Sequence, residues 1–362
     1  MTKILITLKD ITVTGGAERV CVNLANALSN RGYEVMIASF YQVHAAPPPY
    51  ELCSRVKLRA FSHINPWSKN LFTKLFVNLL HRTLISRKID RFITQTAPDI
   101  VIANDGWYLP PRSKSTPEST PLYYRISHLN APRFSARKVK NFARFDKIIL
   151  LSGKELSAWQ QIHDDISIIP NFLPTLPTRQ ADLSRRRVIA VGRLVGQKGF
   201  LRLVEIWALV QQHECAQGWE LAIIGSGSMQ QELESKITEL GLQDTIKIKP
   251  FTSDIESEYL AASMFVMSSH FEALPMVLLE SASYGLPAVA FDVKTGPSDI
   301  IEHGGSGYLV ENGDLQGFAH RVLELMGDET KRASFGRTAA QIVAQRFSKQ
   351  AILPLWDTIL GE

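Results

Sequence analysis

Arg193 and Lys198 are two cations on one short segment that glycines punctuate at positions 192, 196 and 199. A guanidinium and an ammonium on such a loop can converge on a diphosphate, because both donate charge-assisted hydrogen bonds to phosphate oxygens. The alternative is a solvated basic loop. The pattern favours a site that neutralises a departing nucleotide without a metal ion.

Two carboxylates follow later in the chain. Glu272 stands before a predicted helix, and Glu280 lies eight positions further on, inside it. Eight residues make slightly more than two helical turns, which places Glu280 about 12 Å along the axis on the face near which Glu272 enters. One carboxylate could bind a sugar and the other the ribose of the same nucleotide sugar. Taken alone, such a pair is usually surface charge.

A third feature is the turn at Gly15 and Gly16, directly after the first predicted strand and at the start of a helix. Adjacent glycines let a ligand approach the backbone, and a helix N-terminus offers unpaired N–H groups. A simple tight turn explains the glycines equally well. His128 also follows a predicted strand of the first half, where it could face a ligand or simply bond to the backbone.

Short apolar runs alternate with segments of helical spacing along the whole chain, which is the pattern of βαβ units and a parallel sheet. The predicted strands are 3–8, 33–40, 99–103 and 147–151, then 187–191, 221–224, 245–248, 264–267 and 287–291. A segment at 170–177 that contains three prolines separates the two series and marks a domain boundary. The sequence therefore predicts two doubly wound α/β domains, in which ligands bind beyond the carboxyl ends of the strands.

The composition, the number of cysteines and the charge limit the class of protein further. The 362 residues are 45% hydrophobic and 21% charged, which is typical of a globular protein. Three distant cysteines argue against a disulfide framework, and the N-terminus runs straight into a strand, so we expect a cytoplasmic protein. Residues 1–180 hold 24 Lys and Arg against 12 Asp and Glu, a net charge of +12, whereas the remainder carries −7. This asymmetry predicts that the first half meets an anionic surface or substrate.

Together, the glycine turn, the Arg/Lys loop and the Glu-x7-Glu segment resemble glycosyltransferase family 4, the retaining enzymes of GT-B fold. Gly225-Ser226-Gly227 is similar to that family's second glycine turn, and Thr295-Gly296-Pro297 to a segment of its bacterial polysaccharide branch. Ala273-Leu274 departs from the more usual Gly-Phe. The resemblance implies two Rossmann-like domains facing across a cleft: an acceptor-side domain at 1–172, a linker at 173–184, a nucleotide-sugar domain at 185–345 and a C-terminal helix at 346–362 that crosses back.

The resemblance also implies roles. Arg193 and Lys198 bind the donor diphosphate, Glu280 holds the ribose, and Glu272 lies near the transferred sugar. The other donor-side residues are the backbone of Ala273, Leu274, Pro275 and Met276, the base-binding Pro250 and Phe251, and the loop at Gly15 and Gly16. His128 projects toward the donor sugar and counts, with Arg193, Lys198 and Glu272, among the expected catalytic residues. No cofactor and no metal are expected.

The expected reaction moves a hexose or N-acetylhexosamine from a nucleotide sugar, of which a UDP-sugar is preferred, to a lipid-linked or lipopolysaccharide glycan, forming an α-glycosidic bond. The segment 67–92 is basic and amphipathic, and a second basic run spans 133–144. Either could lie on an anionic membrane or pack on the core. A soluble small acceptor is the alternative. A nucleic-acid-binding protein is a third reading, which no helix-turn-helix, RNP or zinc signature supports.

Overall fold

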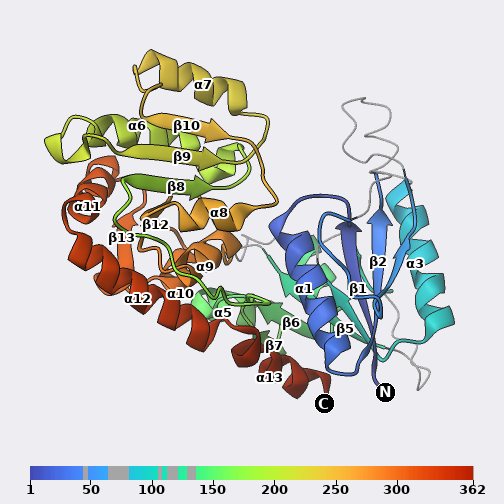
Figure 1. Ribbon diagram of the computed structural model, residues 1–362. Coiled ribbons are helices and arrows are strands. Elements are labelled where there is room, and N and C mark those ends of the chain that lie inside the picture. Colours follow the sequence, from blue (N-terminus) through green and yellow to red (C-terminus); the bar gives the residue numbers. More distant parts are fainter. Residues whose placement is uncertain (44–47, 64–80, 105–107, 112–120, 129–135, 362) are drawn as a thin grey trace. The chain divides into compact units, whose positions relative to one another are not determined.

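The computed structural model describes residues 1–43, 48–63, 81–104, 108–111, 121–128 and 136–361. The chain divides into two compact units. The first comprises Met1–Pro174 together with Ile352–Glu362, and the second is Thr175–Ala351. Each unit is built on one parallel sheet (Figure 1).

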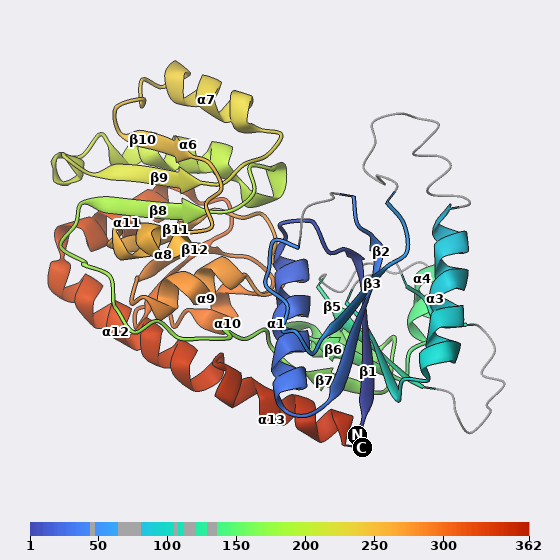
Figure 2. The ribbon, with the colours of Figure 1, turned by 45° about the vertical axis from the view of Figure 1, so that its right-hand side comes forward.

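The sheet of the first unit has seven strands in the order β3-β2-β1-β4-β5-β6-β7. Its strands are β1 (Lys3–Asp10), β2 (Glu34–Tyr41), β3 (Lys57–Ala60), β4 (Ile100–Ala103), β5 (Leu122–Ser127), β6 (Lys147–Leu150) and β7 (Ile166–Ile168). Its helices are α1 (Gly16–Asn30), α3 (Arg82–Thr96), α4 (Ala136–Phe142) and α5 (Leu156–Gln160). Helices α1 and α3 lie on opposite faces of this sheet (Figure 2). The order reverses at β1 and β4, so the loops after these two strands form the switch point at which such sheets bind ligands.

The segment 67–92 is described only in part. Its residues 67–80 lie outside the described ranges, as do most of the second basic run's side chains. In the described part, α3 buries Ile85, Ile89 and Ile93 in the core and exposes Arg87, Lys88 and Arg91. The apolar stripe of this helix is therefore a core stripe, and the basic residues occupy the opposite, solvated face.

The chain's end belongs to the first unit from Ile352 onward. Helix α13 (Lys349–Leu360) carries Asp357, which forms an ion pair with Arg31, the residue that follows α1. The Tyr124 hydroxyl of β5 donates to the Ile359 carbonyl at 2.9 Å. These contacts attach the last turns of α13 to the end of α1 and to β5.

The second unit has a six-stranded sheet in the order β10-β9-β8-β11-β12-β13. The strands are β8 (Arg187–Val191), β9 (Glu220–Ile224), β10 (Ile246–Lys249), β11 (Met264–Met267), β12 (Ala288–Asp292) and β13 (Gly307–Glu311). The helices are α6 (Phe200–Val210), α7 (Gln230–Glu239), α8 (Ile255–Leu260), α9 (Met276–Ser283), α10 (Pro297–Ile300), α11 (Leu315–Gly327) and α12 (Glu329–Arg346). Here the switch point lies between β8 and β11, whose loops carry the Arg/Lys segment and Glu272.

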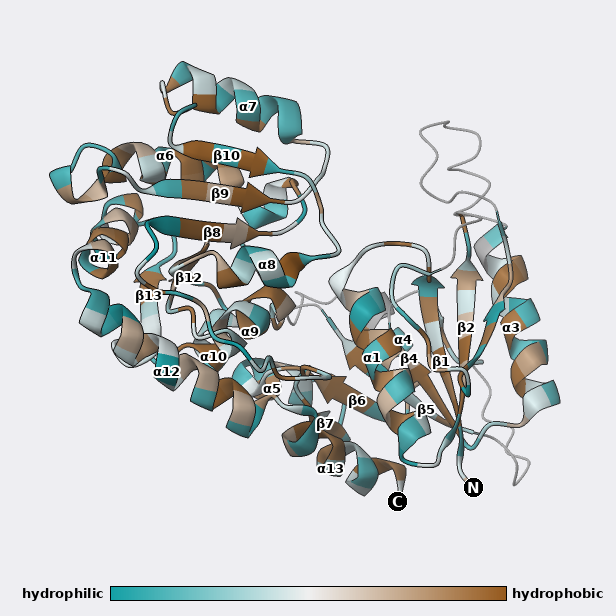
Figure 3. Ribbon diagram, in the orientation of Figure 1, coloured by the Kyte–Doolittle hydropathy of each residue, from teal (hydrophilic) through white to brown (hydrophobic). Residues whose placement is uncertain are grey.

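Hydrophobic residues are concentrated in the strands of both sheets, whereas helices such as α3 and α7 also contain hydrophilic residues (Figure 3). Trp207 of α6 and Phe318 of α11 lie in the core of the second unit, and Trp159 of α5 lies in that of the first. In the described part of the chain, no helix is long and apolar enough to cross a membrane. The prediction of two parallel doubly wound sheets is confirmed.

Candidate functional site

The loop that carries Arg193 and Lys198 is fixed to the neighbouring glycine turn by main-chain contacts. The Gly192 N–H donates to Ile224 at 3.0 Å, and the Leu194 N–H donates to Ser226 at 3.0 Å. A Cβ atom on Gly225 would collide with the Gly192 carbonyl oxygen. Close approach of two backbones therefore requires glycine here, and the two turns form one platform beyond β8 and β9.

Lys198 and Glu272 meet at this platform. The Lys198 ammonium lies 2.5 Å from Glu272 Oε1, and the two side chains are only 16% and 8% exposed. The two residues come from different loops, after β8 and after β11, and 74 positions separate them. The pair brings one cation and one carboxylate together at the switch point of this sheet.

Arg202, in the first turn of α6, joins the same two loops. Its guanidinium donates to the carbonyls of Ser268 and Ser269 at 2.6 and 2.5 Å, and it stacks over the Phe291 ring at 4.0 Å. Burial lowers the pKa of the Arg202 guanidinium to about 10, so it stays charged at neutral pH. Gly199 completes the junction, since its φ is +63° and a Cβ there would collide with the Ser268 carbonyl.

Glu280 lies in α9 and is buried, with 6% of its surface exposed. The Tyr259 hydroxyl, from α8, donates to its Oε2 at 3.1 Å. Pro275 is the residue just before the first helical position of α9 rather than inside the helix. It has no N–H, so the backbone donors of this segment are those of Ala273, Leu274 and Met276.

Thr295 and Gly296 pack behind Glu272. The Thr295 hydroxyl donates to the Glu272 carbonyl at 2.5 Å. Gly296 has a φ of +98°, and a Cβ there would lie 2.8 Å from Pro275 Cδ. This segment thus supports the loop that carries the sugar-side carboxylate.

The predicted base-binding residues are exposed at the end of β10. Phe251 is 57% exposed, and its N–H donates to the Ser226 hydroxyl at 3.3 Å. The loop therefore lies against the second glycine turn. Arg193 is also exposed, and its side chain makes no hydrogen bond or ion pair with a residue in the described ranges.

In the first unit, the structure links the glycine turn and His128 through Asn104. The Asn104 amide donates to the Ala17 carbonyl at 2.9 Å, and its Oδ1 lies 2.9 Å from His128 Nε2. Because the amide NH2 faces Ala17, Oδ1 must accept from His128, which places the imidazole proton on Nε2. Burial and the nearby Arg125 guanidinium lower the pKa of His128 to about 4, so the ring is neutral at pH 7.

Three of these residues were missed in the sequence: Asn104, Arg202 and Tyr259. Asn104 carried a signal, because it is a polar residue directly after a buried strand. Arg202 and Tyr259 act through contacts with distant loops, which spacing along the chain does not reveal. In the described part of the chain, no group of three or more His, Cys, Asp or Glu side chains could hold a metal ion.

Comparison with known proteins identifies the family of the chain. The family model for glycosyl transferases group 1 matches residues 178–342, and the model for glycosyltransferase family 4 matches residues 14–175. The chain is 31% identical over 377 residues to the amylovoran biosynthesis glycosyltransferase AmsD of Erwinia amylovora, covering 100% of both chains. It is 26% identical to the lipopolysaccharide core biosynthesis glycosyltransferase LpsE of Rhizobium meliloti, covering 96% of each.

Solved structures show the same fold at low identity. A mutant of S. aureus TarM, solved with fondaparinux, alpha-GlcNAc-glycerol and UDP, matches with a TM-score of 0.81 and 17% identity, covering 100% of both chains. WaaG, described as a glycosyltransferase involved in lipopolysaccharide biosynthesis, matches with a TM-score of 0.74 and 16% identity, covering 99% of this chain and 100% of that one. The chain therefore belongs to glycosyltransferase family 4 and is a glycosyltransferase of GT-B fold.

Proposed function

We propose that this enzyme transfers a hexose or N-acetylhexosamine from a UDP-sugar to a bacterial surface glycan, with retention and hence formation of an α-glycosidic bond. The acceptor in this proposal is a lipid-linked oligosaccharide or a lipopolysaccharide. The relatives of the chain include amylovoran and lipopolysaccharide core glycosyltransferases, which supports this class of acceptor. One observation carries the donor assignment: Lys198, Glu272 and Glu280 are all held by loops or helices at the carboxyl edge of a single sheet.

In the proposed mechanism, Arg193 and Lys198 bind the diphosphate, and Glu280 accepts hydrogen bonds from the ribose. The leaving diphosphate gains charge as the sugar becomes oxocarbenium-like. Preorganised cations stabilise charge that develops in the transition state. One such contact lowers the activation barrier by about 3–4 kcal/mol. The departing phosphate oxygen accepts the acceptor hydroxyl's proton, so the new bond forms on the face that the nucleotide leaves.

Glu272 has two functions in this scheme. Before donor binding it neutralises Lys198, because the two side chains are only partly solvated. When the diphosphate arrives, Lys198 can turn to the phosphate oxygens, and the Glu272 carboxylate is then available to sugar hydroxyls. The neutral His128 is proposed to accept a hydrogen bond from a sugar hydroxyl through Nδ1, because its Nε2 proton is donated to Asn104.

A panel of nucleotide sugars tests the donor assignment. A bound donor raises the melting temperature by mass action, so a UDP-sugar should stabilise the protein more than ADP- or GDP-sugars at equal concentration. Lys198→Ala should remove that stabilisation. Transfer with a UDP-sugar and an acceptor lipid, followed by NMR of the product's anomeric proton, then tests retention: an α signal is expected, and a β signal contradicts it.

We also propose that the enzyme works at the cytoplasmic face of the inner membrane. The exposed Arg87, Lys88 and Arg91 of α3 and the net charge of +12 over residues 1–180 support an anionic surface as partner. Vesicles containing anionic lipid should retain the protein at low salt and release it at high salt. Replacing the three residues by Glu should abolish retention without lowering transfer to a water-soluble acceptor analogue. Equal retention by neutral vesicles would contradict the proposal.

A further inference from the structure

We propose that Tyr259 is a positioning residue for the ribose-binding carboxylate Glu280, and that an ion-pair cluster around Glu258 holds the helix that presents it. This inference deepens the proposed function and rests on it. It adds Tyr259, Glu258, Arg187 and Lys249 to the donor site, although none of them is expected to touch the donor.

The Tyr259 hydroxyl lies beside the Glu280 carboxyl in the interior of the second unit. The side chain is fully buried, and its ring stacks on Tyr284 with centroids 5.4 Å apart and an interplanar angle of 27°. The hydroxyl lies 3.1 Å from Glu280 Oε2 and 3.5 Å from the Val277 carbonyl. Since a phenol donates one hydrogen, the nearer of these two acceptors, Glu280 Oε2, is favoured. This hydrogen bond fixes the rotation of the Glu280 carboxyl group. It therefore also fixes the direction from which ribose hydroxyls can donate to that group.

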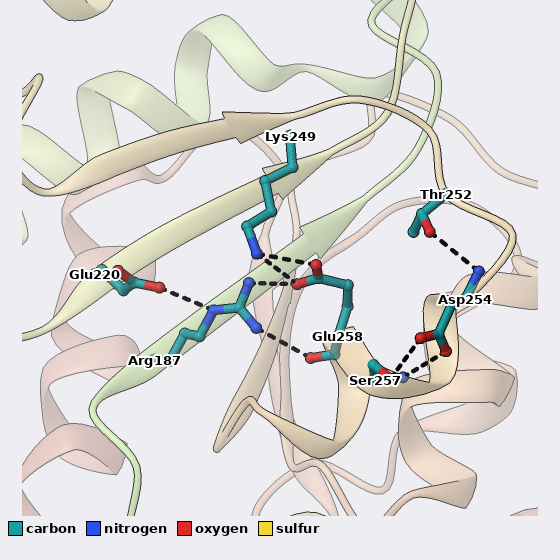
Figure 4. A network of polar contacts seen from close by, with 7 residues as sticks. All are labelled: Arg187, Glu220, Lys249, Thr252, Asp254, Ser257 and Glu258. Carbon is teal, nitrogen blue, oxygen red and sulfur yellow. Dashed lines mark hydrogen bonds and ion pairs between the residues drawn. The ribbon is translucent and has the colours of Figure 1, made fainter.

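Helix α8, which carries Tyr259, is too short to be stable alone, because six residues make fewer than two turns. Glu258, the preceding residue, anchors it to the sheet (Figure 4). Its carboxylate accepts from Arg187 of β8 at 2.5 Å and from Lys249 of β10 at 2.9 Å. Arg187 also donates to the Glu258 carbonyl at 3.3 Å and to Glu220 at 2.9 Å.

The central pair of this cluster, Arg187 and Glu258, is shielded from water, whereas the Lys249 and Glu220 side chains are partly exposed. The Arg187 and Glu258 side chains are 11% and 18% exposed. Burial alone would raise the pKa of the Glu258 carboxyl, but the hydrogen bonds from Arg187 and Lys249 hold it below its ordinary value. Glu258 is therefore ionised at neutral pH, and breaking the cluster would leave a poorly solvated charge.

The same helix also closes the loop of Pro250 and Phe251. Lys249 stands directly before this loop and is tied to Glu258 after it. At the loop's far end, Asp254 caps α8 through the Ser257 N–H and hydroxyl, at 3.2 and 2.6 Å (Figure 4). One short helix thus positions both the exposed base loop and the buried ribose carboxylate.

The test compares UDP with its 2′,3′-dideoxy analogue, which lacks the hydroxyls that Glu280 would bind. Calorimetry on the wild type should show UDP binding at least tenfold more tightly. Tyr259→Phe should reduce UDP affinity about fivefold to tenfold and leave affinity for the analogue within twofold. An equal loss for both nucleotides would mean a merely structural role, and an unchanged preference would also overturn the inference.

Two further variants keep the test decisive. Tyr308→Phe is the matched control, because Tyr308 also donates to a carboxylate, Glu324, elsewhere in the same unit, and it should keep the full preference for UDP. Glu258→Gln should lower the preference for UDP over the analogue, as Tyr259→Phe does. It should also weaken binding of the analogue itself, because the base loop is no longer held by the ion pair with Lys249. An intact preference in Glu258→Gln would overturn the anchoring role. A wild type that binds neither nucleotide would refute the proposed function itself, whereas a preference that Tyr259→Phe leaves intact refutes only this inference.

Discussion

Lys198→Ala is predicted to damage both stability and catalysis, and the structure allows the two effects to be separated. Its ammonium is the partner of the Glu272 carboxylate at 2.5 Å, and Glu272 is 7% exposed. Removing one member of a buried ion pair costs about 3–5 kcal/mol, and the lower end applies because the Lys198 side chain keeps some contact with water. For a unit of this size, a loss of about 3 kcal/mol lowers the melting temperature by about 6–12 °C.

The catalytic loss has a different origin. If Lys198 binds the diphosphate, its removal takes away about 3–4 kcal/mol of transition-state stabilisation, and turnover should fall at least a hundredfold. The double variant Lys198→Met with Glu272→Gln separates the effects, because it leaves no unpaired charge. It should recover most of the melting temperature and none of the turnover.

The assays are thermal unfolding in the absence of donor, so that donor binding does not contribute to stability, and transfer from a UDP-sugar at saturating donor. Near-normal turnover in Lys198→Ala would refute the phosphate assignment. A melting temperature equal to that of the wild type would refute the claim that the Lys198–Glu272 pair is a stabilising contact. A double variant as unstable as the single one would show that the lost stability does not come from the unpaired carboxylate.

Three further predictions concern the surrounding structure. Gly199→Ala should destabilise the second unit by about 1–3 kcal/mol and raise the KM for donor, because φ is +63° and the new Cβ would collide with Ser268; an unchanged melting temperature would contradict this. Arg202→Lys should raise the KM for donor several-fold, since an ammonium cannot bridge both loop carbonyls and stack on a ring; a wild-type KM would contradict it. The pKa of about 4 for His128 predicts that stability falls as pH drops from about 6.5 to 4, because only the unfolded histidine binds a proton there, by on the order of 3 kcal/mol in total. Urea unfolding at pH 7 and 5 should show a smaller loss in His128→Gln than in the wild type, and equal losses would contradict it.

Much of the fold could be predicted because most strands are buried on both faces. Strands β1, β2, β4, β6, β8, β9, β11 and β12 appear in the sequence as short continuous apolar runs. The strands that the sequence did not reveal include β3, β7 and β13, which all lie at sheet edges. Residues of β3 are half-buried or exposed, so this strand presents no apolar run to recognise.

The candidate site could be predicted only where one segment supplies both the loop and its functional residue. The Arg193–Lys198 loop and the Glu272–Glu280 segment met that condition, and the structure joins them through Lys198 and Glu272. Tyr259 and Arg202 could not be predicted in this way, because their roles depend on distant partners. The partner of Tyr259 is 21 positions away, and that of Arg202 is 66 positions away. Such tertiary contacts follow from the order of strands in the sheet, which spacing along the chain does not specify.

A crystal structure of the protein with UDP tests the central claim most directly. We predict that both phosphates lie against Arg193 and Lys198, and that the ribose hydroxyls donate to Glu280 while Tyr259 keeps its contact with that carboxylate. A diphosphate bound away from the loop of Arg193 and Lys198, or a ribose that does not reach Glu280, would contradict the account.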